Sequence, residues 1–79
     1  MITIKVLGKG CANCKRLEQI VHQVIEKEAL EAEVIKVTDF NEIMDYQILS
    51  TPGLVVNEKV VSFGRIPSIE EVTAFLKAA

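Results

Sequence analysis

The apolar positions in the first half of the chain predict a strand, a helix and a second strand. Residues 2–7 are rich in β-branched side chains and stop at Gly8, which is typical of an interior strand. From Cys14 onward, apolar residues at helical spacing form one face: Leu17, Ile20, Val21, Val24 and Ile25. The opposite, polar face carries Lys15, Arg16, Glu18, Gln19, His22, Gln23, Glu26 and Lys27. Residues 33–37 predict a strand parallel to the first, because a strand–helix–strand crossover joins parallel strands.

A second helix is predicted after residue 38. Asp39 followed by Glu42 has the spacing of a capping box, which marks the N-terminus of a helix. We expect this helix to end near Leu49, because the next four residues, 50–53, are Ser-Thr-Pro-Gly and break regular structure. The side chains expected to face inward are Phe40, Ile43 and Met44.

The following segment predicts a β-hairpin. Residues 54–56 and 59–63 form two short apolar runs with only Asn57 and Glu58 between them. A two-residue hairpin turn needs a positive φ at its central residues. Asparagine adopts that conformation readily and glutamate does so poorly. A longer, bulged turn therefore remains an alternative.

The last element is predicted to be a helix from Ser68 to Ala78, because Ser68 and Glu71 form a second capping box. Its apolar stripe is Ile69, Val72, Phe75 and Leu76. The complete order is βαβ-α-ββα, so we expect an α/β fold with a four-stranded mixed sheet flanked by three helices. At 79 residues the chain is expected to form a single domain over residues 1–79.

Composition narrows the class of protein. The chain is 49% apolar and 25% charged with a net charge of −2, which excludes a disordered acidic tail and a basic nucleic-acid-binding protein. No apolar run approaches the roughly 18–20 residues of a membrane span, and the first ten residues lack the pattern of a signal peptide. Two cysteines are too few for the disulfide scaffold of a small secreted domain. We therefore expect a soluble cytoplasmic protein.

The two cysteines lie where the first strand gives way to the first helix. Unpaired N–H groups and the helix dipole favour the thiolate form of Cys11 at the helix N-terminus. Nearby in the sequence, Lys9, Lys15 and Arg16 add positive charge. Cys14 lies one turn further into the helix, so we expect it to be more buried and protonated. This arrangement suits thiol–disulfide exchange, with Cys11 as the nucleophile and Cys14 as the resolving thiol.

Two other interpretations of this pair are a structural disulfide and a metal site. A disulfide closing a four-residue loop stabilises a fold by only about 2 kcal/mol in the loop-entropy model, so a purely structural disulfide here would add little stability. Metal binding is the alternative function, because small copper and zinc carriers also place CxxC after a first strand and thiolates suit Cu(I).

Three features count against the metal site. Lys9 occupies the position where that family usually has methionine, and the chain ends in the helix predicted over residues 68–78 where that family ends in a strand. The sequence has no third cysteine, and His22 is expected to be a solvated surface residue. We therefore predict no metal and no cofactor.

Residues 51–53 (Thr-Pro-Gly), together with the CxxC pair, resemble the thioredoxin superfamily along essentially the whole chain. The short prokaryotic thioredoxin/glutaredoxin-like proteins are closest in size. The resemblance implies a cis-proline at Pro52, a substrate strand pairing with the backbone of Thr51, and close approach of substrate backbone at Gly64. The residues that would border the same groove are Arg65 and Ile66.

The chain departs from the thioredoxin pattern at several positions. Ala12 and Asn13 stand between the cysteines in place of Gly-Pro or Pro-Tyr, and Gly10 stands where thioredoxins have tryptophan. The acid that thioredoxins bury beneath the active site has no clear counterpart. Lys5, six residues before Cys11, would favour a thiolate and the reduced form if its ammonium reached the thiols. The favoured interpretation is a lysine that snorkels from the edge or end of its strand.

The resemblance and the cysteine chemistry together predict a thiol–disulfide oxidoreductase that reduces protein disulfides. Its expected partners are an upstream disulfide reductase and disulfide-containing client proteins. Nucleic acid and membranes are not expected partners, and we expect a monomer.

Overall fold

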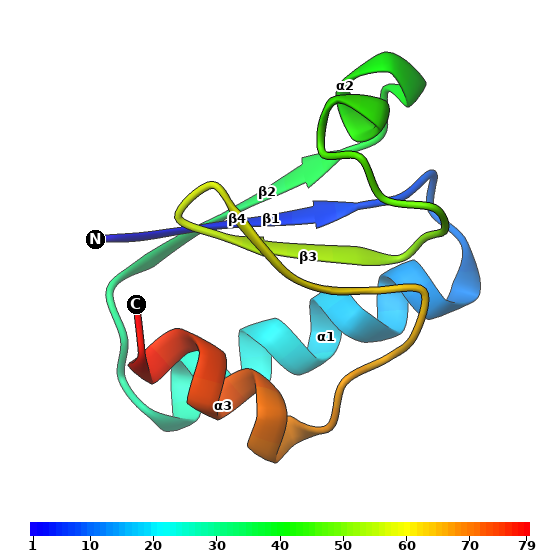
Figure 1. Cartoon of the computed structure of the whole chain (residues 1–79). Helices are drawn as coiled ribbons and strands as arrows, with labels where there is room; N and C mark the ends of the chain where they lie inside the picture. Colours follow the sequence, from blue (N-terminus) through cyan, green and yellow to red (C-terminus); the bar gives the residue numbers. More distant parts are fainter.

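The four strands form one mixed sheet in the order β2-β1-β3-β4 (Figure 1). The computed structural model describes residues 1–79. Its elements are β1 (Ile2–Leu7), α1 (Ala12–Lys27), β2 (Ala32–Val37), α2 (Phe40–Asp45), β3 (Gly53–Val56), β4 (Lys59–Phe63) and α3 (Ile69–Lys77). β1 pairs parallel to β2 and antiparallel to β3, and β3 pairs antiparallel to β4. The predicted α/β fold, element order and interior position of the first strand are confirmed.

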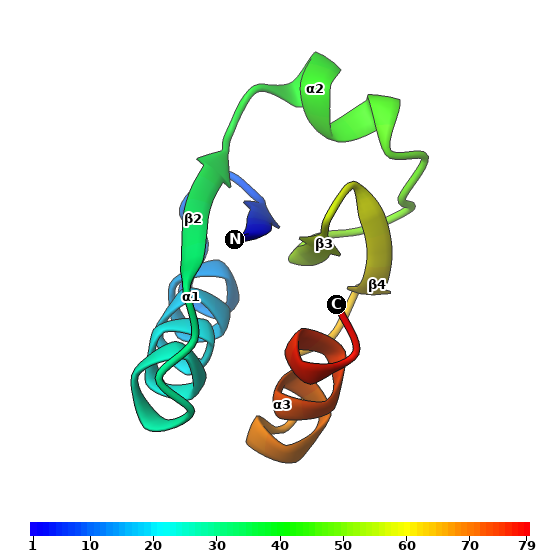
Figure 2. The same cartoon turned by 90° about the vertical axis from the view of Figure 1, so that its left-hand side faces the viewer.

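The helices lie on opposite faces of this sheet. Figure 2 shows α1 and α3 beneath the strands and α2 above them. The larger core, on the α1 and α3 face, contains Ile4, Val6, Leu17, Val21, Val24, Leu54, Val56, Val72 and Leu76. The smaller core, on the α2 face, contains Leu7, Val37, Ile43, Ile48 and Val55. Side chains therefore alternate between the two cores along β1 and β3, as expected for strands covered on both faces.

The prediction for α2 is partly wrong. The helix is only six residues long and ends at Asp45, because the chain enters the left-handed region at Gln47 (φ 57°). Fewer than two helical turns direct only one apolar side chain, Ile43, into the core. Phe40 and Met44, predicted to face inward, are 59% and 50% exposed.

The hairpin between β3 and β4 uses the two-residue turn. Asn57 and Glu58 have φ values of 49° and 67°, so the longer turn does not form. The bulge lies further along the hairpin, between Leu54 and Val55. The Glu58 carboxylate accepts hydrogen bonds from the Lys5 ammonium at 3.0 Å and the Tyr46 hydroxyl at 2.9 Å, and these contacts anchor a residue that is unusual at this turn position.

The predicted capping box at the start of α3 is confirmed. Ser68 and Glu71 exchange both side-chain-to-backbone hydrogen bonds, and the helix ends at Lys77 with Ala78 as its C-cap. Val72 and Leu76 are buried as predicted, whereas Ile69 is largely exposed. None of the three helices has the length and apolar character needed to cross a membrane.

Candidate active site

The cysteine pair lies at the junction of β1 and α1, and the two sulfurs form a disulfide. Cys11 is the N-cap of α1, and its Sγ accepts the backbone N–H of Cys14 at 3.1 Å. Cys11 is exposed, whereas Cys14 is only 5% exposed. The predicted difference between an accessible sulfur and a buried one is therefore present.

The charges around this junction favour a negative sulfur. The first turn of α1 contains no acidic residue, and Lys15 and Arg16 follow the second cysteine directly. Lys9 lies in the loop before Cys11, and its ammonium sits 6.0 Å from the centre of the Phe40 ring. A helix N-terminus without acidic neighbours stabilises an anion, so reduction of the disulfide leaves Cys11 in a site suited to a thiolate.

Gly8 contacts the buried cysteine so closely that a side chain at this position would displace the Cys14 sulfur. A Cβ atom built at Gly8 would overlap Cys14 Sγ, and it would lie 3.7 Å from Cβ of Thr51. The backbone N–H of Gly8 donates to the carbonyl of Val37 at 2.9 Å, which continues the β1–β2 pairing by one residue. Sequence reasoning treated Gly8 only as a strand end. The available signal in the sequence was a glycine in the short loop between a predicted strand and the CxxC pair.

The Thr51–Pro52 peptide bond is cis, as the resemblance implied. Because Leu7 pairs with Gly53 across β1 and β3, Pro52 comes to the same end of the sheet as the disulfide. Pro52 is buried and Thr51 is exposed. This end of the sheet lies on the right in Figure 1, where β1 ends and both β3 and α1 begin.

Gly64 joins the same end of the sheet through a direct hydrogen bond. Its backbone N–H donates to the carbonyl of Pro52 at 3.0 Å. Its φ of 76° lies in the left-handed region, and an added Cβ would be 2.5 Å from Ser50 Oγ. The structure thus brings five predicted site residues to one end of the sheet: Cys11, Cys14, Thr51, Pro52 and Gly64.

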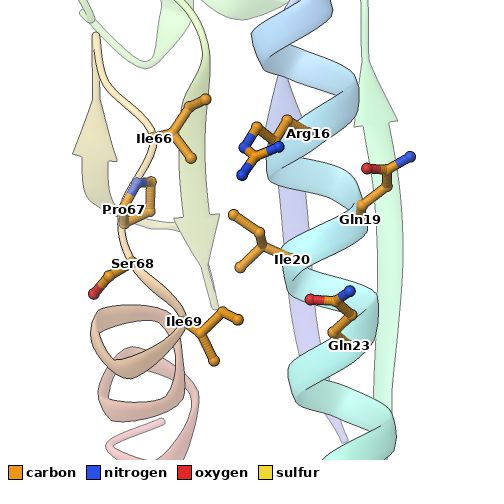
Figure 3. A pocket seen from close by; sticks show the side chains of 8 residues that line it. All are labelled: Arg16, Gln19, Ile20, Gln23, Ile66, Pro67, Ser68 and Ile69. Atoms are coloured by element: carbon orange, nitrogen blue, oxygen red, sulfur yellow. The ribbon is translucent and has the colours of Figure 1, made fainter.

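The two residues after Gly64, Arg65 and Ile66, contact different parts of the molecule. The Arg65 guanidinium binds both carboxylate oxygens of Glu71, at 3.0 and 2.6 Å, and this contact lowers the pKa of Glu71 to about 2. Arg65 is therefore held by α3. Ile66 lines a pocket of about 450 Å³ between α1 and the start of α3, facing Arg16 and Ile20 (Figure 3). Ile66 thus borders a groove between α1 and α3.

Lys5 is bound on the α2 side of the sheet. Its ammonium donates to the Tyr46 hydroxyl at 2.9 Å and to the Glu58 carboxylate at 3.0 Å. The hydrogen bond to Tyr46 raises the pKa of Lys5 most, and the hydrogen bond to Glu58 raises it further. The hydrogen bond from Lys5 in turn lowers the pKa of Glu58. Lys5 lies in the central strand, so its placement at an edge or strand end is wrong.

Residues 1–79 contain no group of three or more His, Cys, Asp and Glu side chains that could hold a metal ion. The His22 side chain is 58% exposed, with Nε2 3.9 Å from a carboxylate oxygen of Glu18. His22 is therefore a surface residue, as predicted.

Comparison with known proteins agrees with this geometry. The thioredoxin domain family matches residues 2–77. A thioredoxin of Methanocaldococcus jannaschii is 37% identical over 78 residues, covering 99% of this chain and 90% of the relative. A thioredoxin of Methanothermobacter thermautotrophicus is 32% identical, covering 96% and 99% of the two chains. The crystal structure of the germline-specific thioredoxin Deadhead of Drosophila melanogaster superimposes with a TM-score of 0.68 at 19% identity, covering 98% of this chain and 79% of that one.

The fold and the cysteine pair define a thioredoxin-like protein, and the family match identifies the class. The chain belongs to the thioredoxin domain family and is a thiol–disulfide oxidoreductase. Its Cys11–Cys14 pair is the redox-active CxxC disulfide.

Replacing Gly8 by alanine is expected to disfavour the disulfide, because the new methyl group occupies the space of Cys14 Sγ. The expected cost is about 1–3 kcal/mol, typical of overpacking. Mass spectrometry after thiol alkylation in a glutathione buffer should show a smaller oxidised fraction than in the wild type. Gly10→Ala is the matched control, since it shares the loop and a positive φ but has no atom within 4 Å of the added Cβ. Equal oxidised fractions in the two variants would contradict this account.

Proposed function

We propose that the protein reduces protein disulfides, with Cys11 as the attacking thiolate and Cys14 as the resolving thiol. The observation that carries this assignment is the contrast between the two sulfurs. Cys11 is exposed at a helix N-cap, where its Sγ receives a backbone N–H, and Cys14 is 5% exposed behind it. Access for a client disulfide and stabilisation of a thiolate both favour Cys11 as the first nucleophile.

The exchange proceeds in two steps, in which bonds, protons and electrons are conserved. In the first, the Cys11 thiolate attacks one sulfur of the client disulfide, forming a mixed disulfide and releasing the other client sulfur as a thiolate, which takes a proton. In the second, Cys14 loses its proton and attacks Cys11 Sγ, which breaks the mixed disulfide and releases the second client thiol. Two electrons pass to the client, and the Cys11–Cys14 disulfide forms. An upstream disulfide reductase returns the pair to the dithiol.

We propose that Thr51, Pro52 and Gly64 bind the polypeptide that carries the client disulfide. Thr51 is exposed, and neither its backbone N–H nor its C=O hydrogen-bonds to other backbone groups in residues 1–79. An extended client segment can pair with these two groups as an added strand. Pro52 has no N–H to compete for the client, and Gly64 presents no side chain beside it.

The remaining assignments are proposed on the same basis. The two cores share one sheet and the family match spans nearly the whole chain, which supports a single domain over residues 1–79. A pair that must cycle through a dithiol suits a reducing compartment, so we place the protein in the cytoplasm. We propose that it acts as a monomer on disulfide-containing client proteins.

Serine variants of the two cysteines should separate their roles. In an insulin-reduction assay with dithiothreitol, Cys11→Ser should reduce the rate to that of dithiothreitol alone, because no exposed thiol remains at the helix N-cap. Cys14→Ser should accumulate a mixed disulfide with the client, detected by non-reducing electrophoresis. Wild-type protein without turnover in this assay would contradict the proposal. Stoichiometric Cu(I) binding in an anaerobic titration, together with no turnover, would favour the metal carrier instead.

Gly64→Ala is expected to raise the KM for a protein disulfide several-fold while leaving reduction of a small aromatic disulfide nearly unchanged. The reason is that the proposed client segment passes against Gly64, so an added methyl group and the strain of alanine at a φ of 76° disturb that contact, whereas a small disulfide does not need it. Stopped-flow or steady-state assays with both substrates measure the difference.

A second variant guards against a purely structural effect of this substitution. Ser50→Ala combined with Gly64→Ala removes the hydroxyl that would clash with the new Cβ. The double variant should recover part of the thermal stability, because alanine at a φ of 76° stays strained, and it should keep the raised KM. Recovery of both would show that Gly64 serves the loop and not the client.

A further inference from the structure

A small cavity adjoins the buried cysteine on the α1 face of the sheet. Its volume is about 110 Å³, enough for a few water molecules. Gly8 and Cys14 form part of its lining, and the charged side chains around it are Lys15, Glu18 and Lys36. Glu18 is the only carboxylate among them.

The position of Glu18 follows from two elements of the fold. It lies four residues after Cys14 on α1, so the two side chains share one face of the helix. Lys36 lies on the same side of β2 as Val34, a residue packed against the larger core, and therefore faces α1. The Lys36 ammonium is 3.5 Å from Oε2 of Glu18, and the Glu18 side chain is only 24% exposed.

Basic side chains from two elements face Glu18. Lys36 approaches from β2, and His22 approaches from the next turn of α1 with its Nε2 3.9 Å from Oε1. Lys15 and Cys14 share the cavity from α1, and β1 contributes Val6. The rest of the lining is Gly8 and Gly10 in the loop before α1, and Thr38 directly after β2. No second carboxylate lies in this lining, so Glu18 is the one carboxylate beside the cavity that can accept a proton.

Cys14 needs such an acceptor. Its thiol must ionise before it can attack Cys11, and burial opposes formation of a thiolate. Water in the cavity can carry the proton over the distance that separates the thiol from a carboxylate one helical turn away.

We propose that Glu18 accepts the Cys14 proton through this cavity when the mixed disulfide is resolved, and that Lys36 is the positioning residue that holds its carboxylate there. This inference rests on the proposed roles of the two cysteines. As the proton leaves Cys14, its sulfur bonds to Cys11 Sγ and the Cys11–client bond breaks. The departing client thiolate then takes a proton from solvent, and Glu18 returns its own to solvent. The Lys36 side chain is 65% exposed, so the contribution of the Lys36–Glu18 pair to stability is small.

The test follows the reduced protein with excess 5,5′-dithiobis(2-nitrobenzoate) in a stopped-flow spectrometer. The first release of the coloured thiolate reports attack by Cys11, and the second reports resolution by Cys14. Glu18→Gln should slow the second phase about 10- to 100-fold at neutral pH, as expected for loss of a general base. That phase should also become about tenfold faster per pH unit between about pH 6 and 8, because only direct ionisation of the thiol remains.

Matched variants separate this role from a structural one. Glu26→Gln makes the same change on an exposed turn of α1 and should keep both phases and the wild-type pH profile. Lys36→Met should slow the second phase by a smaller factor, and Lys36→Arg should restore it.

The outcomes are distinguishable. A second phase in Glu18→Gln within twofold of wild type, with an unchanged pH profile, would overturn the inference. Equal slowing of both phases would also overturn it, since it would indicate a general disturbance of the site. Absence of the second phase in the wild-type protein would overturn the proposed roles of the cysteines themselves.

Discussion

Everything at the active site depends on where β1 ends. β1 is held between a parallel and an antiparallel neighbour, and residues 4 and 6 are buried against α1 and α3. Its backbone pairing continues one residue further, to Gly8, before the chain turns into α1. Because the strand is fixed on both sides, the helix N-terminus and its two cysteines have a fixed position relative to Thr51 and Pro52.

The close approach of Gly8 to Cys14 extends this constraint to the chemistry. A residue without a side chain lets the buried sulfur lie directly against the end of the central strand, beside Thr51. The same burial that shields Cys14 from clients also opposes its ionisation, which creates the need for a nearby proton acceptor. The separation of an exposed attacking sulfur from a buried resolving one thus follows from the packing of a strand end against a helix start.

Much of the fold could be predicted because its main elements carry strong local signals. The apolar stripe of α1, the capping box of α3 and the β-branched run of β1 each have one good solution, and tertiary packing agrees with all three. The prediction of inward-facing residues in α2 was partly wrong, because a helix of six residues has too little periodicity to show which side faces inward. Its Phe40 and Met44 are exposed, while Ile48, beyond the helix, fills the smaller core.

The site was predicted where it depends on residue spacing along the chain and missed where it depends on contacts between distant segments. The CxxC pair and the Thr-Pro-Gly segment are visible in the sequence. Glu18 looked like one of many solvated residues on the polar face of α1. Its nearness to Cys14 and Lys36 depends on how β2 lies beside the helix, and no local pattern reports that arrangement.

The equilibrium potential of the Cys11–Cys14 pair tests the central claim most directly. Equilibration in thiol–disulfide buffers, followed by alkylation and mass spectrometry, measures the oxidised fraction at each potential. A reductant of protein disulfides should show a reversible two-electron transition at about −270 mV. A midpoint at about −120 mV, typical of an oxidant, or below about −300 mV, the range of structural disulfides, would contradict the account.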